Sequence, residues 1–137
     1  MAIGATDDKK TNDQIATDCR NLGILVNIVD SPSISNFLVP ATVRRGRLVI
    51  SIGTSGNSPA LAKKIKEELS ALYGPEYGEL TEILGDLRQK VYQNIGCESK
   101  RKLFWERLIN SDMIKLIREK RRKEIKKRIS ALVDQTI

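Results

Sequence analysis

Ile24-Leu25-Val26-Asn27-Ile28-Val29 is a nearly unbroken apolar run rich in β-branched residues. Such a run is typical of a parallel strand that is buried on both faces. Upstream, Ile3-Gly4-Ala5 has the character of a strand end, and apolar residues at helical spacing predict a helix over 12–22. Gly23 follows where a helix commonly ends in a left-handed residue. Strand, helix and strand within about 30 residues form a βαβ unit, so the sequence predicts an α/β fold at its start.

Downstream of this unit, the sequence predicts a β-hairpin followed by helices. The hairpin strands cover 37–43 and 47–52, and Pro40 lies at an edge or a bend because proline cannot donate to a strand ladder. Beyond Gly53 the apolar spacing becomes helical. We expect one helix from Pro59 to Gly74-Pro75, one over 77–95, one that contains 102–109, and a last basic helix capped by Ser111.

The composition is that of an ordinary globular chain, with 40% hydrophobic and 30% charged residues among 137. No apolar run approaches the roughly 20 residues that span a bilayer, and the first residues lack the features of a signal peptide. A cytoplasmic protein without membrane contact is therefore expected. The sequence has no histidine, which excludes a Ser-His-Asp triad or a histidine metal site built by this chain alone. Cys19 and Cys97 are far apart, so we expect two reduced thiols.

The net charge of +7 arises in one segment. From Lys115 to Arg128, nine basic residues stand against two acidic ones, while the rest of the chain is balanced. A basic helix can form a nucleic-acid interface, but its apolar residues favour a helix with one packed and one solvated face, so no nucleic-acid partner is expected. Arg44, Arg45 and Arg47 form a second basic group at the hairpin, which is either a solvated turn or a contact to a ligand's carboxylates.

Polar residues follow the predicted strands at the edge where open α/β sheets bind ligands. Asp30 directly follows the buried strand and either acts as a general base or caps the turn before Pro32. The loop 53–59 joins a strand to a helix N-terminus, which is an anion-binding arrangement, although an ordinary turn with a helix cap uses the same residues. Thr6 and Asp7 follow the first strand, where helix-capping acids are also common.

Five blocks occur together: Ala5-Thr6-Asp7-Asp8, Asn27-Ile28-Val29-Asp30-Ser31-Pro32, Asn36-Phe37-Leu38-Val39-Pro40-Ala41, Thr54-Ser55-Gly56-Asn57-Ser58-Pro59-Ala60-Leu61-Ala62 and Lys100-Arg101-Lys102-Leu103-Phe104-Trp105-Glu106-Arg107-Leu108. In order and spacing they resemble the precorrin-2 dehydrogenase family, which includes the dehydrogenase module of siroheme synthase and the fungal dehydrogenase/ferrochelatase. The resemblance covers most of residues 3–110, and the basic tail after Asp112 is less diagnostic.

The resemblance implies three parts: the end of a Rossmann-type NAD-binding domain over 1–39, a dimerisation segment over 40–73 and a small helical domain over 74–137. It implies a homodimeric enzyme that oxidises precorrin-2, a tetrapyrrole with eight carboxylates, to sirohydrochlorin with NAD as the hydride acceptor. Bifunctional members also insert iron. The family's Gly-rich pyrophosphate loop lies upstream of the matched blocks, so we expect this chain alone to be an impaired dehydrogenase.

The resemblance also implies roles for individual residues. Asp30 matches the family's essential aspartate and is predicted to be catalytic, and to be the metal ligand if the protein is a chelatase. Cofactor contacts are predicted for Thr6, Asp7 and Asn27, and substrate contacts for Asn36, Thr54, Ser55, Gly56 and Ser58. Two other functions stay open. One is a non-catalytic dimerisation or phosphosugar-binding module that uses the loop Thr54–Ser58, and the other is nucleic-acid binding by the basic helix.

Overall fold

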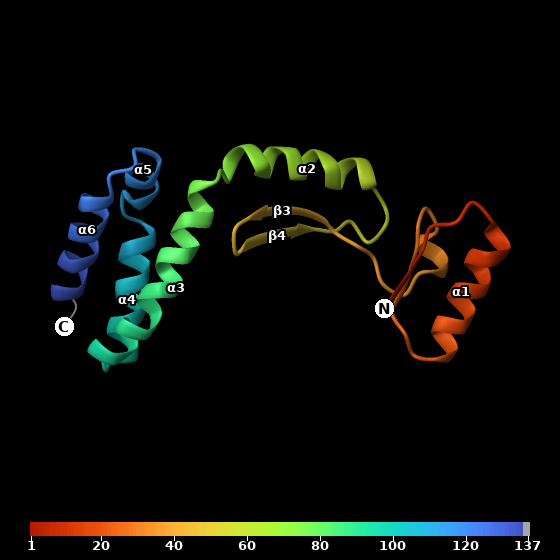
Figure 1. The fold of residues 1–137 in the computed structure, drawn as a ribbon, viewed down its shortest axis with the longest axis horizontal. Helices are drawn as coiled ribbons and strands as arrows, with labels where there is room; N and C mark the ends of the chain where they lie inside the picture. Colours follow the sequence, from red (N-terminus) through yellow and green to blue (C-terminus); the bar gives the residue numbers. More distant parts are fainter. Residues whose placement is uncertain (136–137) are drawn as a thin grey trace. The chain divides into compact units, whose positions relative to one another are not determined.

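A computed structural model describes residues 1–135 of the protein (Figure 1). The chain divides into two compact units. The first contains residues 1–42 and 51–68, and the second contains residues 43–50 and the chain from Leu69 onward. The first unit holds a βαβ element and the second is mainly helical, which confirms the predicted fold class.

The first unit is built on the predicted parallel βαβ element. Its parts are β1 (Ala2–Gly4), α1 (Lys9–Asn21), β2 (Val26–Ile28) and the short 3-10 helix η1 (Pro32–Ile34). β1 and β2 pair in parallel with Gly4 opposite Ile28. Gly23 has a φ of +65°, so the left-handed residue expected after the helix is confirmed. The small core of this unit comprises Ala16, Cys19, Val26 and Ile28.

Helix α1 begins three residues earlier than predicted because Asp8 caps it. The Asp8 carboxylate accepts hydrogen bonds from the backbone amides of Lys10 (3.1 Å) and Thr11 (3.2 Å). The Thr11 hydroxyl, followed by the Lys10 amide, holds the pKa of the Asp8 carboxyl below its ordinary value of 3.8. The first free amides of α1 are therefore satisfied within the chain.

The hairpin consists of β3 (Ala41–Arg45) and β4 (Leu48–Ile52), which form a two-stranded sheet. The predicted start of the first strand at Phe37 is wrong. Residues 35–37 instead lie along the edge of β2 that β1 leaves free, and they hydrogen-bond to it. Pro40 precedes β3, in agreement with its missing N–H.

Arg45 serves the fold rather than either predicted role. Its Nε donates to the carbonyl of Tyr73 and its Nη2 to the carbonyl of Ser70, both at 2.9 Å. These carbonyls belong to the C-terminal turn of α2 (Pro59–Leu72) and the residue just beyond it. The guanidinium therefore caps that helix end and ties it to the hairpin.

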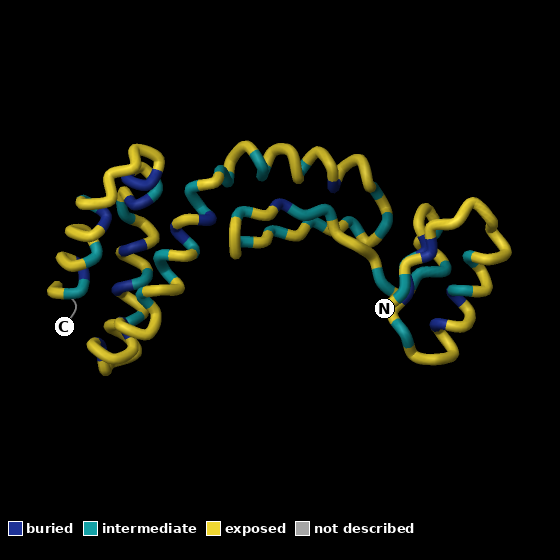
Figure 2. The backbone as a smooth tube through the Cα atoms, in the orientation of Figure 1, coloured by how far each residue is buried: buried dark blue, intermediate teal, exposed yellow. Residues whose placement is uncertain are grey.

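The second unit contains four helices within residues 69–135: α3 (Glu76–Asn94), α4 (Glu98–Ile109), α5 (Met113–Arg118) and α6 (Arg122–Asp134). α5 packs on α3 and α6, and α4 packs on α6. The buried positions recur along these helices (Figure 2). Their core comprises Leu80, Val91, Ile95, Phe104, Leu108, Met113, Leu116, Ile117, Ile125 and Leu132.

The single basic helix predicted after Ser111 is wrong. The chain turns between α5 and α6, where Lys120 has a φ of +56°, and both apolar stretches can then face the same core. Ser111 does not cap the helix, because its hydroxyl donates to the Leu108 carbonyl at 2.7 Å. Part of the positive charge is paired within the unit: Arg118 with Glu76, Arg121 with Glu119 and Glu124, and Arg128 with Asp112. Across residues 1–135, no helix combines the length and apolar character needed to cross a membrane.

Candidate functional site

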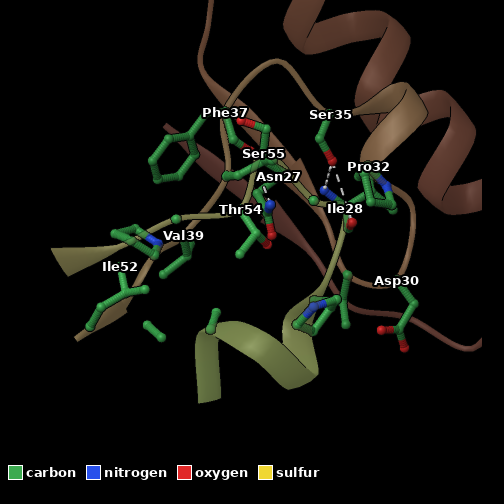
Figure 3. Close-up of a pocket in the computed structure, with 18 of the residues that line it drawn as sticks. Asn27, Ile28, Asp30, Pro32, Ser35, Phe37, Val39, Ile52, Thr54 and Ser55 are labelled. Atoms are coloured by element: carbon green, nitrogen blue, oxygen red, sulfur yellow. Dashed lines mark hydrogen bonds between the residues drawn. The ribbon is translucent and has the colours of Figure 1, made fainter. Parts of the chain in front are cut away.

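A cavity of about 880 Å³ lies in the first unit, at the carboxyl end of β2 (Figure 3). This volume falls within the roughly 300–1,000 Å³ typical of small-molecule sites. The wall is mostly apolar, with Ile28, Val29, Pro32, Phe37, Leu38, Val39, Pro40, Ala41, Ile52, Pro59 and Ala62. Its polar members are Asn27, Asp30, Ser35, Asn36, Thr54 and Ser55. Such a wall suits a ligand with a large apolar surface and few fixed polar groups.

Asp30 stands in this wall in a conformation that L-residues rarely adopt. The Ser31 amide donates to the Ile28 carbonyl at 3.1 Å, which closes a β-turn with Asp30 at its third position. There φ is +60°, as in the type II turns that favour glycine. Asp30 is exposed, and its carboxylate makes no hydrogen bond or ion pair with any residue between 1 and 135. Asp30 therefore does not cap the turn before Pro32 through a side-chain hydrogen bond within residues 1–135, and its catalytic role stays a prediction.

A second left-handed turn lies in the same wall. Ser55 and Gly56 have φ values of +53° and +80°, and the Asn57 amide donates to the Thr54 carbonyl at 2.9 Å. Positive φ at both central residues defines a type I′ turn. Gly56 also permits close contact with the Asp30 turn, because a Cβ at Gly56 would lie 3.1 Å from the Cβ of Pro32. The strained residues of the first unit thus gather at one cavity, as backbone strain does at functional sites.

The segment 35–37 holds the cavity wall by substituting for a third strand. The Val26 amide donates to the Asn36 Oδ1 at 2.7 Å, and the Asn36 amide donates to the Val26 carbonyl at 3.0 Å. The Asn27 side chain donates to the Phe37 carbonyl at 3.0 Å. Asn27 and Asn36 line the cavity, but these amide groups bind the backbone. They shield the edge of β2 that would otherwise be open to another chain.

The structure brings six of the nine predicted site residues to this cavity: Asn27, Asp30, Asn36, Thr54, Ser55 and Gly56. Ser58 is not in the wall, and its hydroxyl accepts the Leu61 amide at 3.2 Å as the N-cap of α2. Thr6 and Asp7 also lie outside the wall, in the loop after β1. The Thr6 hydroxyl is within 2.9 Å of the Asn12 Oδ1, to which it donates. No cluster of three or more carboxylate or thiol residues within 1–135 could hold a metal ion.

Ser35 and the aromatic ring of Phe37 belong to the wall although sequence reasoning did not single them out. Ser35 directly follows η1, and a serine there resembles any loop residue. Only the fold shows that its hydroxyl meets β2. The apolar pattern predicts a strand at Phe37, and a strand pattern does not indicate a side chain that faces a cavity.

Three family models match consecutive parts of the chain. "Putative NAD(P)-binding" covers residues 1–41, "Sirohaem biosynthesis protein central" covers 45–72, and "Sirohaem synthase dimerisation region" covers 76–133. The first model contains most of the cavity wall, and the loop with Ser55 and Gly56 lies in the second.

Relatives of known name agree with these models. A siroheme synthase of Psychrobacter sp. (strain PRwf-1) is 34% identical over 136 residues, which are 99% of this chain and 28% of that protein. A siroheme synthase of Methylococcus capsulatus is 34% identical over 116 residues, 85% of this chain and 24% of the relative. The chain therefore spans about a quarter of the length of these relatives.

A solved structure, "SirC, precorrin-2 dehydrogenase", matches with a TM-score of 0.66 and 29% identity, over 94% of this chain and 62% of that one. The family models, the siroheme synthases and this structure all point to one family. The chain belongs to the precorrin-2 dehydrogenase family, which is also the family of the siroheme synthase dehydrogenase module.

Proposed function

We propose that this chain acts in siroheme biosynthesis by binding precorrin-2 in the cavity beyond β2 for its dehydrogenation to sirohydrochlorin. One observation carries the proposal. Asp30 is the only ionisable residue in the cavity wall, every member of which lies in the described part of the chain. It is exposed and has no partner there. A lone carboxylate held in a strained turn beside an apolar wall is a suitable group to accept a proton.

The charge of the wall indicates how the substrate would lie. A tetrapyrrole has broad apolar faces and carboxylates at its periphery. The wall offers apolar surface but no lysine or arginine. The macrocycle would therefore contact the wall, while its carboxylates would remain in solvent or reach cations outside the cavity. An Asp30 Oδ atom would face the ring and take up the proton released there, and the hydroxyls of Thr54 and Ser55 would orient the ring edge.

The nicotinamide cofactor of the family accepts a hydride when it is bound. The structure tests one part of its site, the start of α1, where a Rossmann helix offers free amides to a pyrophosphate. Here the Asp8 carboxylate occupies the amides of Lys10 and Thr11. The start of α1 therefore does not fit a pyrophosphate, in line with the expectation that the family's pyrophosphate loop lies upstream of the matched blocks. Our proposal for this chain's own residues is limited to substrate binding and proton uptake at Asp30. We propose that the cofactor is NAD rather than NADP and that Thr6, Asp7 and Asn27 contact it.

We also propose that the protein is a homodimer. The resemblance implies a dimer contact over residues 40–73, and the matched dimerisation region covers 76–133. Both stretches leave apolar side chains in solvent: Val49 is 43% exposed, Leu103 41% and Ile109 52%. A partner subunit that covers them would remove this apolar surface from water.

Conversion of precorrin-2 with NAD⁺, followed by the absorbance of sirohydrochlorin, tests the proposed function. We expect the full chain to bind sirohydrochlorin and to form it from precorrin-2 slowly, because the Asp8 carboxylate occupies the Lys10 and Thr11 amides that could otherwise hold a pyrophosphate. Asp30→Asn should lower the rate by about 100-fold or more, the range of general acid–base catalysis. The same variant should keep or improve sirohydrochlorin binding, because a negative charge beside a polyanion is removed. The absence of both binding and conversion in the wild type would refute the proposal, and so would an unchanged rate in Asp30→Asn.

A further inference from the structure

We propose that Ser35 is a positioning residue that fixes the turn carrying Asp30. The inference rests on the proposed function, since it assigns to Ser35 an effect on the reaction that acts through the Asp30 carboxylate. It is carried by the contacts of a single hydroxyl group at the base of that turn.

The Ser35 hydroxyl bridges the two ends of the turn. Its Oγ accepts the backbone amide of Ile28 at 2.9 Å, and it lies 2.9 Å from the carbonyl of Ser31, to which it donates. Dashed lines join Ser35 to Ile28 in Figure 3. Ile28 precedes Asp30 by two residues and Ser31 follows it, so one hydroxyl holds both flanks of the strained residue.

Among residues 1–135, the acceptor of the Ile28 amide is this hydroxyl. The amides of Val29 and Ala2 serve the pairing between β1 and β2, through Gly4 and Leu25. The Ile28 amide faces the opposite edge of β2, where its acceptor is the Ser35 Oγ. Ile28 is only 2% exposed, so water does not readily satisfy the amide if the hydroxyl is lost. The turn would then have to shift to find an acceptor, and the left-handed conformation at Asp30 would shift with it.

The chain provides a matched control two residues away. Ser33 lies in η1, is exposed, and its hydroxyl makes no hydrogen bond with any residue between 1 and 135. It is not in the cavity wall, whereas Ser35 is. Ser33→Ala therefore removes the same atom without changing the turn.

The test is a set of steady-state measurements on the full chain with precorrin-2 and NAD⁺. The variants are Ser35→Ala, Ser35→Thr, Ser33→Ala, Asp30→Asn and the double variant Ser35→Ala/Asp30→Asn. Ser35→Ala should lower kcat about tenfold and leave KM within about twofold, because alignment of the carboxylate changes and the apolar wall does not. Ser35→Thr, which keeps a hydroxyl, should recover most of the rate, and Ser33→Ala should match the wild type.

The double variant separates a positioning role from general destabilisation. If Ser35 acts through Asp30, Ser35→Ala should cause no further loss once Asp30 is Asn, so that the two effects are non-additive. Faster exchange of the Ile28 amide in Ser35→Ala, with the melting temperature of the second unit unchanged, would show that the folded variant has lost this bond.

The outcomes distinguish the two proposals. Conversion by the wild type and its loss in Asp30→Asn, together with an unchanged kcat in Ser35→Ala, would overturn the role of Ser35 and leave the proposed function intact. If Ser35→Ala lowers kcat a further tenfold in the Asp30→Asn background, the positioning role of Ser35 is also overturned, because the effect would not pass through Asp30. If the wild type neither binds nor converts the tetrapyrrole, both proposals are overturned.

Discussion

Replacement of Asp30 by glycine should separate stability from function in this protein. An L-residue in the left-handed region costs about 1–2 kcal/mol, although aspartate tolerates it better than most. Glycine removes that cost but makes the unfolded chain more flexible, which offsets about 0.4–1 kcal/mol. The carboxylate has no partner within residues 1–135, so no contact is lost. We therefore expect Asp30→Gly to be more stable by roughly 0–1 kcal/mol and inactive.

The assay must report on the first unit alone. The single tryptophan and all three tyrosines, Trp105, Tyr73, Tyr77 and Tyr92, lie in the second unit, so fluorescence does not detect unfolding of the first. Native-state exchange of the amides of Val26 and Val29 in and beside β2 measures the opening free energy of the βαβ element directly. Conversion of precorrin-2 is measured on the same samples.

Asp30→Asn is the matched control, because asparagine also tolerates positive φ but has no charge. It should equal the wild type in amide exchange and be as inactive as Asp30→Gly. A loss of more than about 1 kcal/mol in Asp30→Gly would show that the side chain stabilises the fold, which contradicts the reasoning from its strain and missing partners.

Three further variants test other parts of the structure. Gly56→Ala should destabilise the first unit by about 1–3 kcal/mol, because the φ of Gly56 is +80° and the new Cβ would lie against Pro32. Its control is Gly53→Ala, where a Cβ has no atom within 4 Å, so amide exchange should hardly change. Arg45→Ala should destabilise the second unit by about 1–3 kcal/mol in a fluorescence-detected urea titration, because two helix-end carbonyls lose their donor. The pKa of Glu76 lies below its ordinary 4.5, first because the carboxylate accepts a hydrogen bond from its own backbone amide and then because it pairs with Arg118. The stability that Glu76 contributes is thus complete above pH 4.5 and disappears as pH falls through the lowered pKa, so Glu76→Gln should be less stable than wild type at pH 7 but equal to it in strong acid.

The sequence was sufficient where local patterns determine the structure. The apolar run around Val26 and the helical spacing before Gly23 gave the βαβ element, and the block with Asp30 located the cavity. Sequence reasoning failed where a side chain substitutes for backbone. Asn36 and Ser35 complete the edge of β2 with an amide and a hydroxyl, and no strand pattern reveals that arrangement.

The other errors have the same origin in tertiary contacts. The basic segment has a continuous helical pattern, but Ile117 and Ile125 must both reach one core, which requires the break at Lys120. A helix cap and an anion ligand use the same residue type in the same loop. Ser58 is the N-cap of α2, and the substrate contact that the resemblance implies for it stays a prediction.

The most direct test of the central claim is an NMR titration of the ¹⁵N-labelled chain with sirohydrochlorin. We predict saturable shifts of the backbone amides around the cavity, in residues 27–39 and 52–56, with the largest changes at the turns of Asp30 and Ser55. The amides of α4, α5 and α6 should hardly move. Shifts confined to those helices, or no saturable shift at all, would contradict the claim that the cavity beyond β2 is the tetrapyrrole site.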